Sequence, residues 1–396
     1  MAKEEVLLTA EQMMKHQHRW EFIISSTHRY TEKIRLYKHD DYESDVPIFV
    51  VSNHVTNWDP LFLALSFPKN LLYFVTSDHL LKMGFWGKFL DYMVSPIGKK
   101  KGDSVAIDTV RNCLRRIRAG GSIALFAEGE TSWNGVTGEI FPATGKLVKK
   151  SGITLVTYKI EGGYLFKPRW SEESRRGRVY GHPVNVYPPE VLKQMTPAQI
   201  NETIMDDIYD DTWAWQAKHH RKYASLHSAE HLETALYMCP KCREISTLHS
   251  FREKLMCRRC GNEVTMTSTG EFEPMIPFRN IYEWDMWQRK ELNKLCKRTT
   301  GELFSDKNAK LNVFRDDIKY EATTGRLSIS KQELKIGLKT FAIEDIRDMA
   351  MVRNNQLAFC SRDMYYEIVA ANETDIINLR KYLEVFHIFT NKGMLG

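Results

Sequence analysis

A histidine and an aspartate near residue 55 have types and spacing suited to general-base chemistry. His54 follows the apolar run Val46–Ser52, and Asp59 comes five residues later, directly before Pro60. Five residues of regular helix rotate by about 500°, so the two side chains would diverge unless a turn lies between them. Asp59 and Pro60 predict that turn, with Asp59 near a helix N-cap and Pro60 at the first helical position. A carboxylate that holds one imidazole nitrogen leaves the other free to accept a proton. The alternative is a plain helix cap beside a hydrogen-bonded surface histidine.

Three consecutive lysines between two glycines form a candidate anion-binding segment: Lys99, Lys100 and Lys101. Lysine binds phosphate as a point charge, and glycine lets backbone N–H groups approach an anion. The alternative for such a run is an ordinary solvated face.

A glutamate and a glycine, Glu128 and Gly129, stand at the end of another apolar run, 122–127. Ligands bind at the strand ends of α/β sheets, so Glu128 is a candidate to hold a substrate hydroxyl. It could instead cap the turn that follows.

The elements that must position these residues alternate between strands and helices, which predicts an α/β fold with a sheet covered by helices. Short β-branched or apolar runs predict strands, and segments with helical periodicity predict helices between them. The predicted strands are 46–52, 71–76, 122–127 and 153–160, and the predicted helices are 1–45, 60–67, 79–93, 104–118, 143–150 and 196–223.

In order and spacing, these polar segments resemble the glycerolipid acyltransferase family, which acylates 1-acylglycerol-3-phosphate and related lysolipids. The family's first motif is Asn-His, four residues and Asp, matched here by Asn53, His54 and Asp59. Its second motif places a basic residue after an apolar strand, where this chain has the three lysines instead of the usual arginine. Of the third motif, the chain keeps Phe126, Glu128, Gly129 and Ser132 but has Ala127, Glu130 and Thr131 between them. The resemblance covers residues 45–190 of the chain.

This resemblance implies direct acyl transfer from a thioester, either acyl carrier protein or acyl-coenzyme A, to a lysophospholipid hydroxyl. His54 would be the general base and Asp59 would orient it. The resemblance also implies substrate-binding roles for Asn53, Lys99, Lys100, Lys101, Glu128, Gly129 and Ser132. The altered third motif supports an alternative, a lipid-binding or adaptor protein that keeps the fold without turnover.

Four of the seven cysteines form two Cys-x-x-Cys pairs: Cys239, Cys242, Cys257 and Cys260. Each pair can present two thiolates from a tight turn, and two such pairs complete a tetrahedral zinc site. The sequence therefore predicts a structural Zn²⁺ in a zinc ribbon, with two reduced cysteine pairs as the alternative.

The C-terminal part predicts a small β domain, because short alternating strands between residues 303 and 370 precede one amphipathic helix that begins near residue 372. This order of elements is similar to that of pleckstrin-homology-like modules. The predicted domains are an acyltransferase domain over 1–225, with an N-terminal helix over 1–45 and a motif core over 46–190, a zinc ribbon over 226–275, a connector over 276–302, and the β domain over 303–396.

Composition is that of a globular protein with a mildly basic balance: net charge +6, 43% hydrophobic and 27% charged residues. No apolar run is long enough to cross a bilayer, and no signal peptide precedes the first strand. We therefore expect a cytoplasmic protein peripherally bound to the cytoplasmic face of a membrane. The segment 79–93, rich in aromatic and long apolar residues, could lie in the membrane interface or form a core helix. A nucleic-acid partner is disfavoured because the basic residues are not concentrated in any one predicted domain.

Overall fold

A computed structural model describes residues 15–22, 25–27, 36–77, 95–99, 103–275, 277–315, 318–362, 364–372 and 376–390. The chain divides into two compact units. The first unit comprises residues 1–132, 136–166 and 177–215, and the second comprises 133–135, 167–176 and 216–396. The second unit therefore contains two short segments that interrupt the first unit in sequence.

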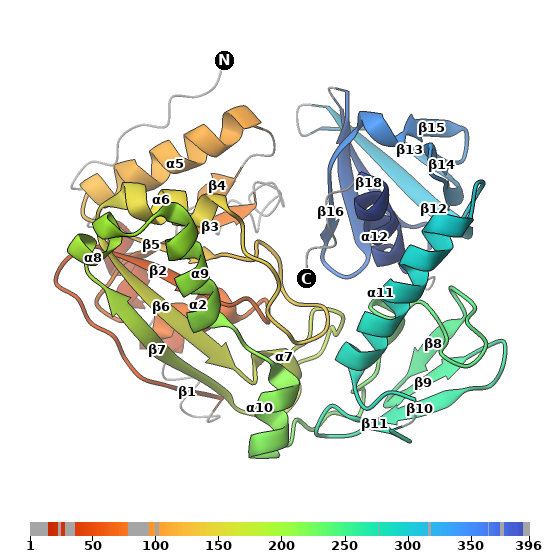
Figure 1. Ribbon diagram of the computed structural model, residues 1–396, viewed down its shortest axis with the longest axis horizontal. Coiled ribbons are helices and arrows are strands. Elements are labelled where there is room, and N and C mark those ends of the chain that lie inside the picture. The colour runs from red at the N-terminus through yellow and green to blue at the C-terminus, as the bar shows by residue number, and fades with distance from the viewer. Residues whose placement is uncertain are drawn as a thin grey trace. The chain divides into compact units, whose positions relative to one another are not determined.

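The first unit is built on a seven-stranded mixed sheet with strand order β1-β7-β6-β2-β5-β3-β4 (Figure 1). All neighbouring strands are parallel except β6 and β7. The strands are β1 (Tyr37–His39), β2 (Ile48–Ser52), β3 (Leu72–Ser77), β4 (Ile97–Lys99), β5 (Ser122–Phe126), β6 (Thr154–Glu161) and β7 (Val179–Tyr187). Every residue of β2 is buried, as expected for a central strand covered on both faces.

Helices cover this sheet and connect its strands: α2 (Asp59–Leu65), α5 (Asp103–Arg118), α6 (Ala143–Ser151), α7 (Gly163–Phe166), α8 (Pro189–Gln194), α9 (Pro197–Ile208) and α10 (Thr212–His219). Helices α5, α6 and α9 form one layer, in which α6 packs between the other two (Figure 1). The start of α9 is a complete capping box between Thr196 and Gln199. The predicted α/β fold is confirmed.

Two of the predicted helices differ from the structure. The helix predicted over 1–45 does not reach residue 45, because Tyr37–His39 is an edge strand paired with β7. The helix predicted over 196–223 ends at Ile208, and a second helix begins at Thr212. Between them, the Asp210 backbone exchanges hydrogen bonds with Thr137, which turns the chain away from the helix axis. The predicted helix 79–93 lies outside the described residues.

The second unit begins with a short 3₁₀ turn, η1 (Leu232–Thr234), and a four-stranded antiparallel sheet. Its strands are β8 (Leu248–Phe251), β9 (Lys254–Cys257), β10 (Glu263–Met266) and β11 (Phe272–Glu273). The range predicted as a connector contains an eighteen-residue helix, α11 (Ile281–Arg298), which starts at an Asn280 cap and buries Trp284.

The rest of the second unit is a seven-stranded antiparallel sheet followed by one helix, α12 (Arg380–Phe389). The strands are β12 (Phe304–Arg315), β13 (Ile318–Ile329), β14 (Glu333–Ile336), β15 (Lys339–Ala342), β16 (Ile346–Val352), β17 (Gln356–Ser361) and β18 (Met364–Ala370), with the 3₁₀ turn η2 (Ile343–Asp345) before β16. The predicted strands-then-helix order is confirmed, although α12 starts at residue 380 and not near 372. Its fully buried Tyr382 contacts Phe304 edge to face and donates to the Leu327 carbonyl.

Candidate active site

The parallel pairing of β2 with β5 brings the first and third sequence motifs to the same edge of the sheet. Ser52 and Phe126 are register partners, so His54 and Glu128 follow neighbouring strands at equivalent positions. The carboxyl ends of strands are where ligands bind in open α/β sheets.

His54 and Asp59 form the predicted dyad. His54 Nδ1 lies 2.8 Å from Asp59 Oδ2, and the turn between them closes through the Asp59 N–H, which donates to the Thr56 carbonyl at 3.1 Å. The carboxylate does not cap α2. Its Oδ2 instead accepts the backbone N–H groups of Val55 at 2.6 Å and Thr56 at 2.8 Å.

Burial is the main influence on the Asp59 carboxylate. Complete burial raises the pKa of Asp59, and the hydrogen bond and charge of His54 oppose that rise. With Nδ1 directed at Asp59, the other ring nitrogen, Nε2, is available to take a proton. Across the part of the chain that the structure describes, Nε2 makes no hydrogen bond.

The backbone of His54 is fixed on both sides by the loop that follows β5. The His54 N–H donates to Glu128 Oε1 at 2.7 Å, and its carbonyl accepts the Ser132 N–H at 2.9 Å. The imidazole also stacks on Phe126, with ring centroids 4.3 Å apart. Sequence reasoning did not assign this platform role to Phe126, although its position at the end of an apolar strand was visible.

Glu128 is buried, and both of its carboxylate oxygens accept backbone N–H groups. The second donor is Gly138, at 2.8 Å from Oε2. Burial raises the pKa of Glu128 to about 8, while the Gly138 and His54 donors oppose the rise. These contacts tie the 128–138 loop to the end of β2, so they support a positioning role more than contact with a substrate hydroxyl.

Three other predicted substrate-binding residues also contact the scaffold. Asn53 is fully buried, and its side-chain amide exchanges two 2.8 Å hydrogen bonds with the backbone of Ile160 on β6. Ser132 Oγ donates to the Val136 carbonyl at 2.8 Å. Gly129 has φ +76°, and a Cβ there would lie 2.2 Å from the Phe141 ring, so the position requires glycine.

The predicted lysine cluster is only partly described. Lys99 is the last residue of β4, whose parallel pairing with β3 places it at the same edge of the sheet as His54. Lys100 and Lys101 lie outside the described residues.

The four predicted metal ligands come together in the second unit. The sulfur atoms of Cys239, Cys242, Cys257 and Cys260 all lie within 4.8 Å of one another. Two of the Sγ–Sγ distances are 3.6 and 3.7 Å, close to the roughly 3.8 Å that tetrahedral Zn–S bonds of about 2.3 Å require.

Two similar turns present these sulfur atoms. In each turn the N–H four residues after the first cysteine donates to that cysteine's carbonyl, from Arg243 to Cys239 and from Gly261 to Cys257. Arg243 and Gly261 both have positive φ, which closes each turn tightly. The arrangement could hold one metal ion.

Residues 33–161, about a third of the chain, match the family model described as Acyltransferase. That segment contains both members of the dyad and the third motif, so the predicted resemblance to the acyltransferase family is confirmed over these residues. No curated protein matches the sequence.

Among solved structures, the chain is similar to the crystal structure of the 1-acyl-sn-glycerophosphate (LPA) acyltransferase PlsC from Thermotoga maritima. The sequences are 15% identical, the TM-score is 0.41, and the alignment covers 52% of this chain and 81% of that one.

Proposed function

We propose that this protein transfers a fatty acyl group from an acyl thioester to a hydroxyl of a lysophospholipid such as 1-acylglycerol-3-phosphate. The observation that carries the proposal is the His54–Asp59 pair, 2.8 Å apart at the carboxyl end of β2 within the acyltransferase-family segment.

In the proposed reaction, His54 Nε2 takes the proton of the acceptor hydroxyl while that oxygen attacks the thioester carbonyl carbon. Asp59 holds Nδ1–H and stabilises the imidazolium that forms. When the tetrahedral intermediate collapses, the C–S bond breaks and the imidazolium returns the proton to the leaving thiolate. No acyl-enzyme is needed, because the acceptor itself attacks the thioester.

The basic segment that begins at Lys99 is proposed to bind the acceptor's phosphate. In the strand order β2-β5-β3-β4, three strand spacings separate β2 from β4, or roughly 14 Å between backbones. The acceptor's polar head would lie along this edge, with its hydroxyl at His54. Asn53, Glu128, Gly129 and Ser132 hold the site's backbone in this proposal, as their contacts suggest.

The acyl donor is proposed to be acyl carrier protein or acyl-coenzyme A, and the protein is proposed to work peripherally at the cytoplasmic face of a membrane. Within the described residues, no helix combines the length and apolar character that crossing a bilayer requires. The segment 79–93, which could lie in the membrane interface or form a core helix, lies outside the described residues.

The cysteine cluster is proposed to hold a structural Zn²⁺. The metal would be four-coordinate with no open position, so it would stabilise the fold and take no part in acyl transfer.

The test is acyl transfer by the purified protein and its His54→Ala variant. Mixed lysolipids with and without phosphate are offered with each donor type, and products are identified by mass spectrometry. We expect a diacyl lipid from the wild type and a loss of about 10²-fold or more in kcat for His54→Ala.

Thr56→Ser is the matched control, because it changes a side chain in the same turn and keeps the backbone N–H that Asp59 uses. No product with any pairing, from folded and metal-loaded protein, would favour the lipid-binding or adaptor alternative. Near-normal turnover by His54→Ala would refute the assignment of the base.

A further inference from the structure

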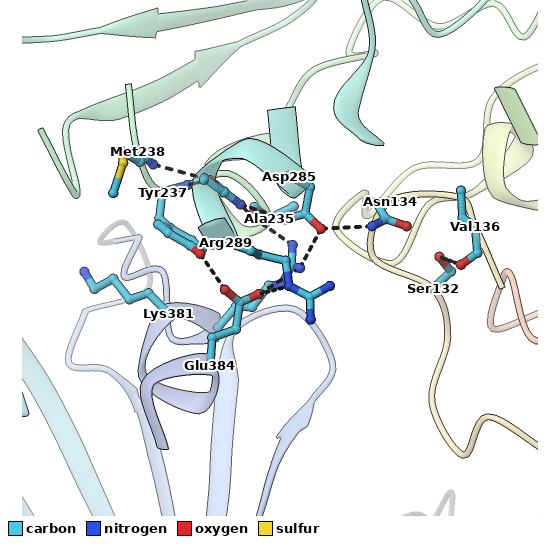
Figure 2. Close-up of polar contacts among 12 residues, drawn as sticks. Ser132, Asn134, Val136, Ala235, Tyr237, Met238, Asp285, Arg289, Lys381 and Glu384 are labelled. Atoms are coloured by element: carbon cyan, nitrogen blue, oxygen red, sulfur yellow. Dashed lines mark hydrogen bonds and ion pairs between the residues drawn. The ribbon is translucent and has the colours of Figure 1, made fainter. Parts of the chain in front are cut away.

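The second unit contains a cluster of buried charged side chains that the proposed reaction does not use. We call it the Asp285 cluster; it consists of the charged residues Asp285, Arg380, Glu384 and Arg289 together with the uncharged Tyr237 and Gln288. Figure 2 labels Asp285, Glu384, Arg289 and Tyr237 among them. Arg380 lies 2.8 Å from Asp285 Oδ2 and 2.8 Å from Glu384 Oε1, and Tyr237 donates to Glu384 Oε2 at 2.5 Å. Helix α11 supplies Asp285, and helix α12 supplies Arg380 and Glu384.

Such a cluster is not explained by stability alone. Removing these charges from water is costly, and a buried ion pair often contributes no more than a well-packed apolar pair. Burial would raise the pKa of Asp285, but the charges of Arg380 and Arg289 outweigh burial and hold that pKa below its ordinary value. The Asp285 carboxylate therefore stays ionised, and its ion pair with Arg380 fixes its orientation, so it can accept a hydrogen bond from a polar partner in a defined position.

One partner of Asp285 comes from the loop that follows the third motif. Asn134 Nδ2 donates to Asp285 Oδ2 at 3.0 Å, across 151 residues of sequence (Figure 2). Two guanidinium groups contact the neighbouring Trp133 ring, that of Arg169 at 4.4 Å and that of Arg380 at 5.1 Å from the ring centroid. By its contacts, the three-residue segment 133–135 belongs to the second unit.

The residues on both sides of this segment hold the backbone around His54. Ser132 Oγ donates to the Val136 carbonyl, which closes the base of the 133–135 loop, and the Ser132 N–H donates to the His54 carbonyl. A few residues on, Gly138 donates to the same Glu128 carboxylate that accepts the His54 N–H. Trp133 is one peptide bond and Asn134 two peptide bonds away from Ser132, whose N–H donates to the His54 carbonyl, so a shift of either residue would be passed to that contact.

We propose that Asn134 and Trp133 are positioning residues for His54, and that the Asp285 cluster fixes them. The inference rests on the proposed function only in what it says about catalysis. The cluster acts along the chain. It fixes Trp133 and Asn134, which follow Ser132 directly. Ser132 bonds the His54 carbonyl, and Glu128 bonds the His54 N–H.

The first test is Asn134→Ala, which removes the amide donor while Arg380 and Gln288 still satisfy Asp285. We expect kcat to fall about tenfold, because a small misplacement of a base is costly, while KM for both substrates changes less than about twofold. Ser228→Ala is the matched control: Ser228 is a buried residue of the same unit, and its Oγ donates to the Met266 carbonyl. It should leave kcat unchanged.

The second test follows His54 directly and needs no turnover. In protein labelled with ¹⁵N-histidine, the His54 ring signals are assigned by their loss in His54→Ala. Asn134→Ala and Trp133→Leu should move those signals, and Ser228→Ala should not. In the His54→Ala background, Asn134→Ala should cause no further loss of residual activity, because its effect acts through His54.

Unmoved His54 signals in both loop variants would overturn the proposal, as would equal movement in Ser228→Ala. A tenfold loss that persists in the His54→Ala background would also overturn it. If the wild type transfers no acyl group, the proposed function fails, and the ring signals still decide whether the loop positions His54.

Discussion

The replacement Asp59→Asn separates the charge of Asp59 from its shape. In the structure a single oxygen, Oδ2, accepts three hydrogen bonds: from His54 Nδ1, from Val55 N and from Thr56 N. An asparagine oxygen in that place can accept the same three donors as a neutral group. Within the described part of the chain Oδ1 has no hydrogen-bond partner, so the added NH₂ group would replace an atom that was already unpaired.

We therefore expect Asp59→Asn to lower kcat by destabilising the transition state, in which His54 becomes positively charged. Hydrogen bonds to charged groups contribute about 1.5–3 kcal/mol. Losing that stabilisation of the imidazolium corresponds to a decrease in kcat of roughly 10- to 150-fold. Asp59→Ala differs, because it leaves the buried N–H groups of Val55 and Thr56 unpaired at a cost of about 1–3 kcal/mol each.

The assay measures kcat with saturating donor and acceptor, together with the urea midpoint of each variant. We expect Asp59→Asn to lose turnover and keep the wild-type midpoint, and Asp59→Ala to lose both. A kcat for Asp59→Asn within about twofold of the wild type would refute the reasoning. If the urea midpoint of Asp59→Asn were as low as that of Asp59→Ala, the replacement would have broken the hydrogen bonds of the turn and not only removed the charge.

The remaining predictions concern stability. Burial raises the pKa of both Glu128 and Asp210 to about 8, so between about pH 4.5 and 8 the folded state binds more protons than the unfolded state. The free energy of unfolding should therefore fall as pH rises through that window, by at most about 1.4 kcal/mol per pH unit for each group. Asp210→Asn should make the urea midpoint depend less on pH. An unchanged dependence of the midpoint on pH would contradict the assignment. Gly129→Ala should destabilise the first unit by about 1–3 kcal/mol, because φ is +76° and the added Cβ meets the Phe141 ring. Gly152→Ala is the control, because Gly152 has a similar φ of +70° but an added Cβ there meets no atom within 4 Å. Cys257→Ser should lower bound zinc, measured by mass spectrometry, and expose the β8–β11 region to proteolysis, whereas Cys360→Ser should retain the metal.

Much of the fold was predictable from sequence because its signals are local. The apolar runs that became β2, β5 and β6 are long enough to identify buried strands, and the Thr196–Gln199 capping box marked the start of α9. Edge strand β1 was not predictable, because its three residues are held as a strand by pairing with β7. The break before α10 likewise depends on Asp210 bonding to Thr137, 73 residues away in sequence.

The sequence alone determined the pairing of His54 with Asp59 and the grouping of the four cysteines. Both depend on short spacings and on the turns that those spacings require. Only the tertiary structure decided what the other motif residues contact, because a side chain's partners depend on what packs beside it. Asn53 bonds to Ile160 on a neighbouring strand, and Glu128 holds the His54 N–H. The contact between Asn134 and Asp285 joins residues 151 positions apart, a pairing that no local pattern specifies.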